Sequence, residues 1–265
     1  MSQDPREWNS DAYHQLSEPQ LHWGNRVLSW LRLRGDETVL DAGCGTGRVT
    51  AELLNLLPRG QVVASDISEN MLGTARDHLK PRFAKHVEFV AADSQYLPFD
   101  RAFDGVFSTA SFHWVRDHDR LFRSVFRVLK PGGWLRAQCG GHGNVQRLMA
   151  RIAELVAAEP QFAKHLQDYD HPWEFATAET AAERLRRAGF VEIETELEPA
   201  AASFADKEEY KQFLATVVLR THLERITAPN VKEKFLNALA QQAAEDNPAF
   251  ELDYTRLNLR ARRPA

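Results

Sequence analysis

A turn that carries three glycines constrains the fold of this chain more than any other feature. The glycines occupy alternate positions, 43, 45 and 47, between a β-branched run at 38–41 and a helical stretch from Arg48. Glycine lets the backbone turn sharply and approach a ligand without a Cβ clash. A dinucleotide-binding fingerprint needs its third glycine at position 48, where this chain has arginine. The sequence therefore predicts a strand–turn–helix unit that binds a ligand other than a dinucleotide.

Short apolar or β-branched runs alternate with helical stretches through the first half of the chain. The predicted strands lie at 38–41, 61–66, 87–92, 103–108 and 134–139. The predicted helices lie at 48–57, from an N-cap at Ser68 to 79 ahead of Pro81, and at 119–129 ahead of the breaker at 130–133. Strands of this kind, separated by helices, are typical of a parallel sheet that is covered on both faces.

Helical stretches interrupt the later strands, one at 191–197 and a last one near the C-terminus. In the last strand Arg256, Asn258 and Arg260 alternate with apolar residues, which predicts that these three side chains lie on a wetter face. We expect an α/β fold: a Rossmann-like, seven-stranded, mostly parallel sheet with helices on both faces, plus helical inserts that form a cap. We expect one domain over 1–265. It begins with a helical lid at 1–35 and continues with the half of the sheet that carries the glycine turn, at 36–139. Two helical inserts lie at 140–176 and 203–250.

Composition and charge exclude several classes of protein. The formal net charge is −4, from 33 Lys and Arg against 37 Asp and Glu, so no basic field recruits nucleic acid. The two cysteines, Cys44 and Cys139, form no disulfide framework and suggest a reducing compartment. No apolar signal segment or membrane-length apolar run occurs. We expect a soluble, cytoplasmic protein without a membrane or nucleic-acid partner and, since only 117–119 groups histidine with carboxylates, without a metal.

The acid that precedes the glycine turn selects the class of ligand. Asp41 lies two residues before Gly43, where we expect its carboxylate to face the ligand. A carboxylate there repels a pyrophosphate and favours an ammonium or a sulfonium. S-adenosyl-L-methionine carries both of these cations and no phosphate, so the sequence predicts this ligand.

Two further acids follow the next two predicted strands. Asp66 ends the second strand, where a carboxylate can accept hydrogen bonds from both ribose hydroxyls, or can cap the following helix. Asp93 follows the third strand and can accept from an adenine amine, or can close an Asx-turn. Ile67 and Met71 offer an apolar wall for the ring.

Five blocks in register over residues 36–139 resemble the class I S-adenosylmethionine-dependent methyltransferases: VLDAGCGTGRVT, VVASDISENML, AADSQYLPF, FDGVFSTASFHWVRD and LKPGGWL. The resemblance implies that Asp41 and the loop of Gly43, Cys44, Gly45 and Gly47 hold the methionine end of the donor. It also implies that Asp66 binds the ribose and Asp93 the adenine amine. By the same match Ser94 contacts the adenine through its backbone, and the Ser108 carbonyl approaches the methionine amino group.

Three further segments resemble the trans-aconitate methyltransferase branch and its small-molecule relatives. They are the run from Ser111 to His118, Trp8-Asn9 together with Tyr13, and the closing LNLRARR. Tyr13 with Trp8 forms a lid over the methionine end or packs the first helix. The branch usually has glutamine where this chain has His113, so the resemblance does not carry over the identity of the acceptor.

Methyl transfer to a small-molecule acceptor is the function that these features predict. His113 lies just past the fourth predicted strand, at the edge where open α/β sheets bind ligands. It can serve as the base for a hydroxyl or amine acceptor, whereas a carboxylate needs none, or it can line the pocket. The alternative function is a non-catalytic S-adenosylmethionine-binding module or accessory subunit. No pattern in the sequence indicates an oligomeric state.

Overall fold

The computed structural model describes residues 7–265, which divide into two compact units. The first, here called the sheet unit, runs to His142 and resumes over Trp173–Glu198 and Arg256–Ala265. The second, here called the helical unit, consists of Gly143–Pro172 and Pro199–Thr255. The helical unit covers much of the two inserts expected at 140–176 and 203–250, while their role as a cap stays a prediction.

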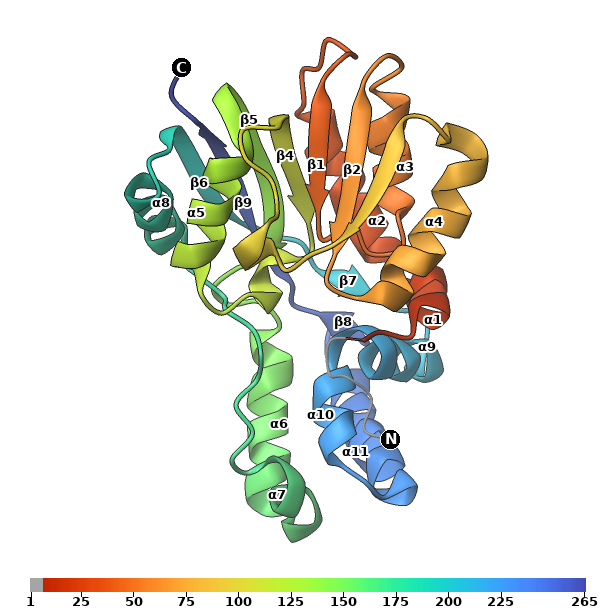
Figure 1. Cartoon of the computed structure of the whole chain (residues 1–265). Helices are drawn as coiled ribbons and strands as arrows, with labels where there is room; N and C mark the ends of the chain where they lie inside the picture. Colours follow the sequence, from red (N-terminus) through yellow and green to blue (C-terminus); the bar gives the residue numbers. More distant parts are fainter. Residues whose placement is uncertain (1–6) are drawn as a thin grey trace. The chain divides into compact units, whose positions relative to one another are not determined.

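The sheet unit is built on a seven-stranded sheet of order β3-β2-β1-β4-β5-β9-β6 (Figure 1). Its strands are β1 Thr38–Ala42, β2 Gln61–Asp66, β3 Val87–Ala91, β4 Phe103–Thr109, β5 Leu129–Gly140, β6 Val191–Pro199 and β9 Thr255–Arg262. Strands β1 to β5 pair in parallel, and β9 pairs antiparallel with β5. The predicted Rossmann-like, mostly parallel sheet is confirmed.

Helices cover both faces of this sheet. They are α1 Ser10–Leu16, α2 Glu18–Ser29, α3 Arg48–Asn55, α4 Glu69–Phe83, α5 His118–Val128 and α8 Ala178–Arg187, with 3-10 turns η1 Ser94–Tyr96 and η2 Phe112–Trp114. Neighbouring strand residues point to opposite faces. Val39 therefore packs with Val27 of α2 and Leu53 of α3, while Leu40 belongs to the cluster that contains Phe122 of α5 and Leu185 of α8.

The helical unit consists mainly of short helices. Its elements are α6 Gln146–Ala158, α7 Pro160–Leu166, β7 Ala202–Ser203, α9 Lys207–Phe213, the π-helical η3 Leu214–Val218, α10 Arg220–Arg225, α11 Pro229–Ala244 and β8 Glu251–Leu252. Tyr210, Phe213 and Leu214 recur at helical spacing and are all buried, so they form a packing face. Within residues 7–265, no helix is long and apolar enough to cross a membrane.

Three local predictions are wrong. Helix α4 continues past Pro81 to Phe83, because a proline in the last turn removes only one of its final hydrogen bonds. Strand β5 begins at Leu129 instead of at 134, although α5 does end before 130–133 as predicted; the Gly132 N–H donates to the carbonyls of Arg263 and Pro264, which extends the strand. Arg256 is only 2% exposed, because its guanidinium lies over the ring of Trp23 instead of on a wetter face.

Candidate active site

The candidate site residues follow the carboxyl ends of four neighbouring strands. Asp41 stands in β1, opposite Ala64 of β2, and Asp66 ends β2 opposite Ala91 of β3. On the other side of β1, Ser108 stands near the end of β4. The strand order reverses between β1 and β4, and open α/β sheets bind their ligands at such a switch point. The fold therefore brings the predicted acids to one edge.

The glycine turn needs its glycines for two reasons. Gly43 and Gly47 both have a φ of +80°, in the left-handed region that L side chains rarely adopt. A Cβ on Gly43 would lie 1.9 Å from the Ser111 hydroxyl oxygen, so the loop after β4 packs directly on the turn. The N–H groups of Gly43 and Cys44 both donate to the Ser65 carbonyl, at 2.8 and 2.9 Å, and fix the start of the turn.

Asp41 is a buried carboxyl group, with only 2% of the residue exposed. The Thr50 hydroxyl donates to its Oδ2 at 2.7 Å. Burial, assisted by the charge of Asp66, raises the pKa of Asp41 to about 7, although the bond from Thr50 opposes the shift. A cation bound at the turn would favour the ionised form of Asp41.

Both oxygens of Asp66 are held by backbone N–H groups. Gly45 donates to Oδ2 at 2.9 Å, and Ser68 donates to Oδ1 at 3.0 Å. Burial raises the pKa of Asp66, and these hydrogen bonds act in the opposite direction. Each carboxylate oxygen has a further lone pair for a ribose hydroxyl. The predicted N-cap of α4 is confirmed as Ser68, whose Oγ accepts from the Met71 N–H at 3.2 Å.

The remaining predicted donor contacts lie near these acids. Asp93 closes an Asx-turn, because its Oδ1 accepts from the Gln95 N–H at 2.9 Å, and the buried Ser94 begins η1. Ile67, directly after Asp66, is 39% exposed, while Met71 is buried. Burial raises the pKa of the Cys44 thiol well above its usual value, so Cys44 fills space in the turn as a neutral group. The Ser108 hydroxyl donates to the Ala42 carbonyl at 2.7 Å.

Glu7 is a residue of the site that sequence reasoning missed. Its carboxylate accepts hydrogen bonds from the Ser68 hydroxyl at 2.9 Å and from the N–H groups of Glu69 and Asn70, both at 3.1 Å. An acid is favourable at a helix N-terminus, where the first N–H groups lack partners within the helix. This contact holds the N-terminal segment next to Asp66. No local pattern reveals it, because the two ends of the contact lie far apart in the sequence.

Aromatic contacts continue from the N-terminal segment to the turn η2. The ring of Trp8 meets Tyr13 at 5.5 Å and Trp114 at 5.1 Å, edge to face in both cases. Burial and the charge of Asp66 raise the pKa of Tyr13 to about 12, so its hydroxyl is neutral. Tyr13 therefore lies within electrostatic reach of the carboxylate expected to bind the ribose.

His113, in η2, is held as a neutral imidazole. Its Nδ1 accepts a hydrogen bond from the Gly140 N–H at 3.3 Å, and its ring stacks on Phe175 at 5.9 Å. Burial, together with the charges of Arg256 and His118, lowers the pKa of His113 well below its usual value. Because Nδ1 accepts, Nε2 carries the proton of the neutral ring. Nε2 of His113 can therefore donate a hydrogen bond. This favours a role in which His113 contacts the methyl acceptor over a role as a base.

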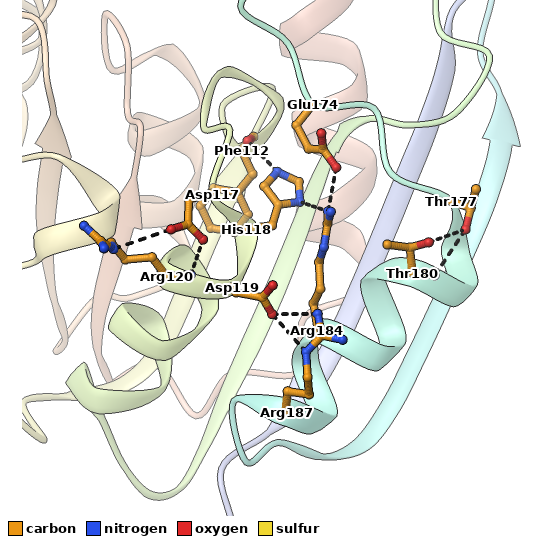
Figure 2. Close-up of polar contacts among 10 residues, drawn as sticks. All are labelled: Phe112, Asp117, His118, Asp119, Arg120, Glu174, Thr177, Thr180, Arg184 and Arg187. Carbon is orange, nitrogen blue, oxygen red and sulfur yellow. Dashed lines mark hydrogen bonds and ion pairs between the residues drawn. The ribbon is translucent and has the colours of Figure 1, made fainter.

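A polar network fixes the turn that carries His113 (Figure 2). His118 Nε2 donates to the Phe112 carbonyl at 3.0 Å, and Arg184 of α8 donates to His118 Nδ1 at 3.3 Å. Arg184 also pairs with Glu174 at 2.7 Å, and the Glu174 N–H donates to the His113 carbonyl at 2.8 Å. Residues on α5 and α8 thus hold η2 in place. Over the described residues, no group of three His, Cys, Asp or Glu side chains could hold a metal ion.

Comparisons with known proteins agree with this geometry. A model described as a methyltransferase domain matches residues 39–133. Trans-aconitate 2-methyltransferase from Variovorax paradoxus is 32% identical over 164 residues, which cover 62% of this chain and 61% of that protein. Demethylmenaquinone methyltransferase from Lactococcus lactis is 33% identical over 181 residues, which cover 62% of this chain and 71% of that protein.

The fold is similar to that of solved methyltransferases. Phosphoethanolamine N-methyltransferase 2 from Haemonchus contortus, in complex with S-adenosyl-L-methionine, superposes with a TM-score of 0.63 at 19% identity, over 97% of this chain and 57% of that chain. This chain belongs to the class I S-adenosylmethionine-dependent methyltransferases, whose cofactor is S-adenosyl-L-methionine. The chain spans about three fifths of the trans-aconitate relative from Variovorax paradoxus.

Proposed function

We propose that this protein transfers the methyl group of S-adenosyl-L-methionine to a small-molecule acceptor with a carboxylate, hydroxyl or amine nucleophile. The observation that carries the proposal is the position of Asp41 and Asp66, two carboxylates at the ends of adjacent strands, on either side of a turn of three glycines. This arrangement suits a ligand with a ribose and a cationic amino acid end. The names of the curated relatives supply two first acceptors to test, trans-aconitate and demethylmenaquinone.

Each residue at the edge of the sheet has a task in donor binding. Asp41 supplies the counter-charge for the methionine end, Asp66 accepts from the ribose hydroxyls, and the Ser108 carbonyl accepts from the amino group. Asp93 and the Ser94 backbone contact the adenine, and Ile67 with Met71 packs against the ring. Tyr13 belongs to the segment that covers the donor.

Alignment and exclusion of water account for most of the catalysis that we propose. Bound S-adenosyl-L-methionine supplies a methyl group already activated by its positive sulfur. The protein has to hold the acceptor in line and keep water away. His113 contributes by donating from Nε2 to an acceptor oxygen, and the network around Arg184 keeps its turn in position. Residues 140–176 and 203–250 contribute to the choice of acceptor.

Two measurements in sequence test the proposal. Calorimetric titration with S-adenosylhomocysteine should show one site, which Asp66→Ala weakens strongly. Donor with a labelled methyl group is then incubated with trans-aconitate, demethylmenaquinone and a pooled metabolite extract, and labelled products are identified by mass spectrometry. Product formation supports the enzyme. Donor binding without any product supports the alternative, a non-catalytic binding module or accessory subunit.

A further inference from the structure

A pocket on the sheet unit lies away from the edge where the candidate donor residues meet. It has a volume of about 200 Å³ and is lined by residues 30–33, 134–136 and 260–262. The first of these segments follows α2, and the other two belong to β5 and β9, which are neighbours in the sheet (Figure 1). Arg136 stands four positions before Gly140, the last residue of β5. At ~3.3 Å per residue it is about 13 Å from the carboxyl end of the strand, so the pocket is separate from the candidate active site.

The lining of this pocket is positive. The described residues that line it include no acid and four arginines: Arg32, Arg136, Arg260 and Arg262. Arg136 stands directly opposite Arg260 in the antiparallel pair of β5 and β9, and like charges in this position destabilise a sheet. Burial and the charge of Arg260 lower the pKa of Arg136, while Glu194 acts in the opposite direction. An anion bound beside both guanidinium groups would offset their repulsion.

The N–H groups of these arginines are only partly used within the protein. Over residues 7–265, the side chains of Arg32 and Arg136 form no ion pair and no hydrogen bond. Arg260 pairs with Glu194 through Nη1 alone, which donates to both carboxylate oxygens at 2.9 Å. Arg262 pairs with an acid of β6 and contributes mainly its charge. Arg136 and Arg260 therefore both keep N–H groups for an anion.

Two tryptophans give the pocket flat apolar walls. Trp134 lies on the backbone of β4, where a Cβ on Gly105 would be 2.1 Å from its ring. The missing side chain of Gly105 thus leaves the space that the indole fills. Trp30 follows the last residue of α2, and both tryptophans are partly exposed. An aromatic ring can stack on such a surface, and guanidinium groups bind phosphate oxygens through parallel N–H bonds.

We propose that this pocket binds a small molecule in which an aromatic group carries a phosphate, as in a mononucleotide. Arg136 and Arg260 bind the phosphate, and the exposed Arg32 adds a third positive charge. The aromatic ring packs on Trp30 and Trp134. The inference goes beyond the proposed function and does not depend on it, because no residue of the donor edge lines the pocket.

Calorimetric titration of protein saturated with S-adenosylhomocysteine tests this site, because the donor site is then full. Uridine monophosphate and phenyl phosphate are compared with uridine and phenol, which lack the phosphate. Both are also compared with ribose 5-phosphate, which lacks the aromatic ring. We expect at least one of the two aromatic phosphates to bind about tenfold or more tightly than its phosphate-free counterpart and than ribose 5-phosphate.

Substitutions in the lining assign this binding to the pocket. Arg136→Gln and Trp30→Ala should each weaken it about tenfold, with unchanged affinity for S-adenosylhomocysteine. Arg32→Gln is an exposed change that leaves the sheet intact and should weaken the binding about threefold, so it decides the question if Arg136→Gln does not fold. Arg123→Gln is the matched control, an exposed position on α5, which covers the other face of the sheet.

The inference is wrong if neither aromatic phosphate binds more tightly than its fragments, or if the arginine variants bind it as the control does. Competition between the ligand and S-adenosylhomocysteine would assign the binding to the donor site. A single-stranded oligonucleotide that binds more than about tenfold more tightly than uridine monophosphate would show that this surface contacts nucleic acid instead of a small molecule.

Discussion

The hydroxyl of Thr50 donates a hydrogen bond of 2.7 Å to Oδ2 of Asp41 in the interior of the sheet unit. The bond favours the charged carboxylate, yet burial outweighs it and the pKa of Asp41 reaches about 7. Asp41 therefore changes charge near neutral pH. Since a cation favours the ionised form, donor binding and proton release are coupled at this residue.

We expect the affinity for S-adenosyl-L-methionine to fall as the pH decreases through 7. A carboxyl group with a raised pKa is neutral below that value and then no longer attracts the cation. Between pH 7.5 and 5.5 its ionised fraction falls about 25-fold, and the dissociation constant should rise by about this factor. Calorimetry in buffers of different ionisation enthalpy measures both the affinity and the released proton.

Asp41→Asn is the control for this pH profile. Asparagine keeps an acceptor for Thr50 but cannot ionise, so donor affinity should be low and independent of pH from 5.5 to 7.5. A flat profile for the unaltered protein, or a variant that keeps the pH dependence, would contradict the role of Asp41.

Glu7→Gln should speed the release of the donor. The amide has the size of the carboxylate but lacks the charge that favours the N-terminus of α4, so the N-terminal segment is held less tightly. We expect S-adenosylhomocysteine to dissociate about fivefold faster, with little change in its association rate, measured by stopped-flow fluorescence. Glu52→Gln, an exposed change on α3, serves as the control. An unchanged dissociation rate would show that the contact does not retain the donor.

Arg184→Ala should lower turnover without weakening donor binding. The change removes both the pair with Glu174 and the contact with His118, which together hold the turn of His113. We expect kcat/KM for the acceptor to fall about tenfold and the affinity for S-adenosylhomocysteine to stay the same, with partial rescue by Arg184→Lys. Arg187 lies on the same helix as Arg184 but forms an exposed pair with Asp119 of α5. Arg187→Ala breaks this pair and should have no effect on turnover. Equal effects of the two alanine changes would rule out the positioning role.

Replacement of His113 by glutamine separates a hydrogen-bond donor from a base. A glutamine amide can donate in place of Nε2–H but cannot take up a proton at these pH values. We expect His113→Gln to keep kcat within about threefold, and His113→Ala to lose about tenfold. A large loss in both variants, together with an acid limb in the pH–rate profile of the unaltered protein, would identify His113 as a base.

The sheet and the donor edge could be predicted from sequence because their signals are local. β-branched runs located β1 to β4 within a residue or so, and Asp41 and Asp66 stand at fixed distances from the glycine turn. Pro81 and the early start of β5 were missed for a related reason. Whether Pro81 ends the helix depends on how close it lies to the last turn. The start of β5 depends on hydrogen bonds to residues near the C-terminus, and residues close in sequence encode neither.

The contacts of Glu7 and Arg256 could not be predicted from the sequence. An acid near the N-terminus has many helices that it could cap, and only the folded chain places Glu7 at α4. The alternating pattern of β9 predicted a solvent-exposed side chain at Arg256. A pattern within one strand contains no information on Trp23 of α2, whose ring packs against the guanidinium. Long-range partners decide both positions.

The close approach of Gly43 to Ser111 limits how this protein can be recombined with its relatives. The turn expected to hold the donor and the turn that carries His113 interlock there, with no room for a Cβ. A chimera whose crossover point falls between these two residues combines two turns from different proteins, and their side chains do not have complementary shapes. Acceptor specificity is therefore expected to transfer between such enzymes only when both turns are exchanged together.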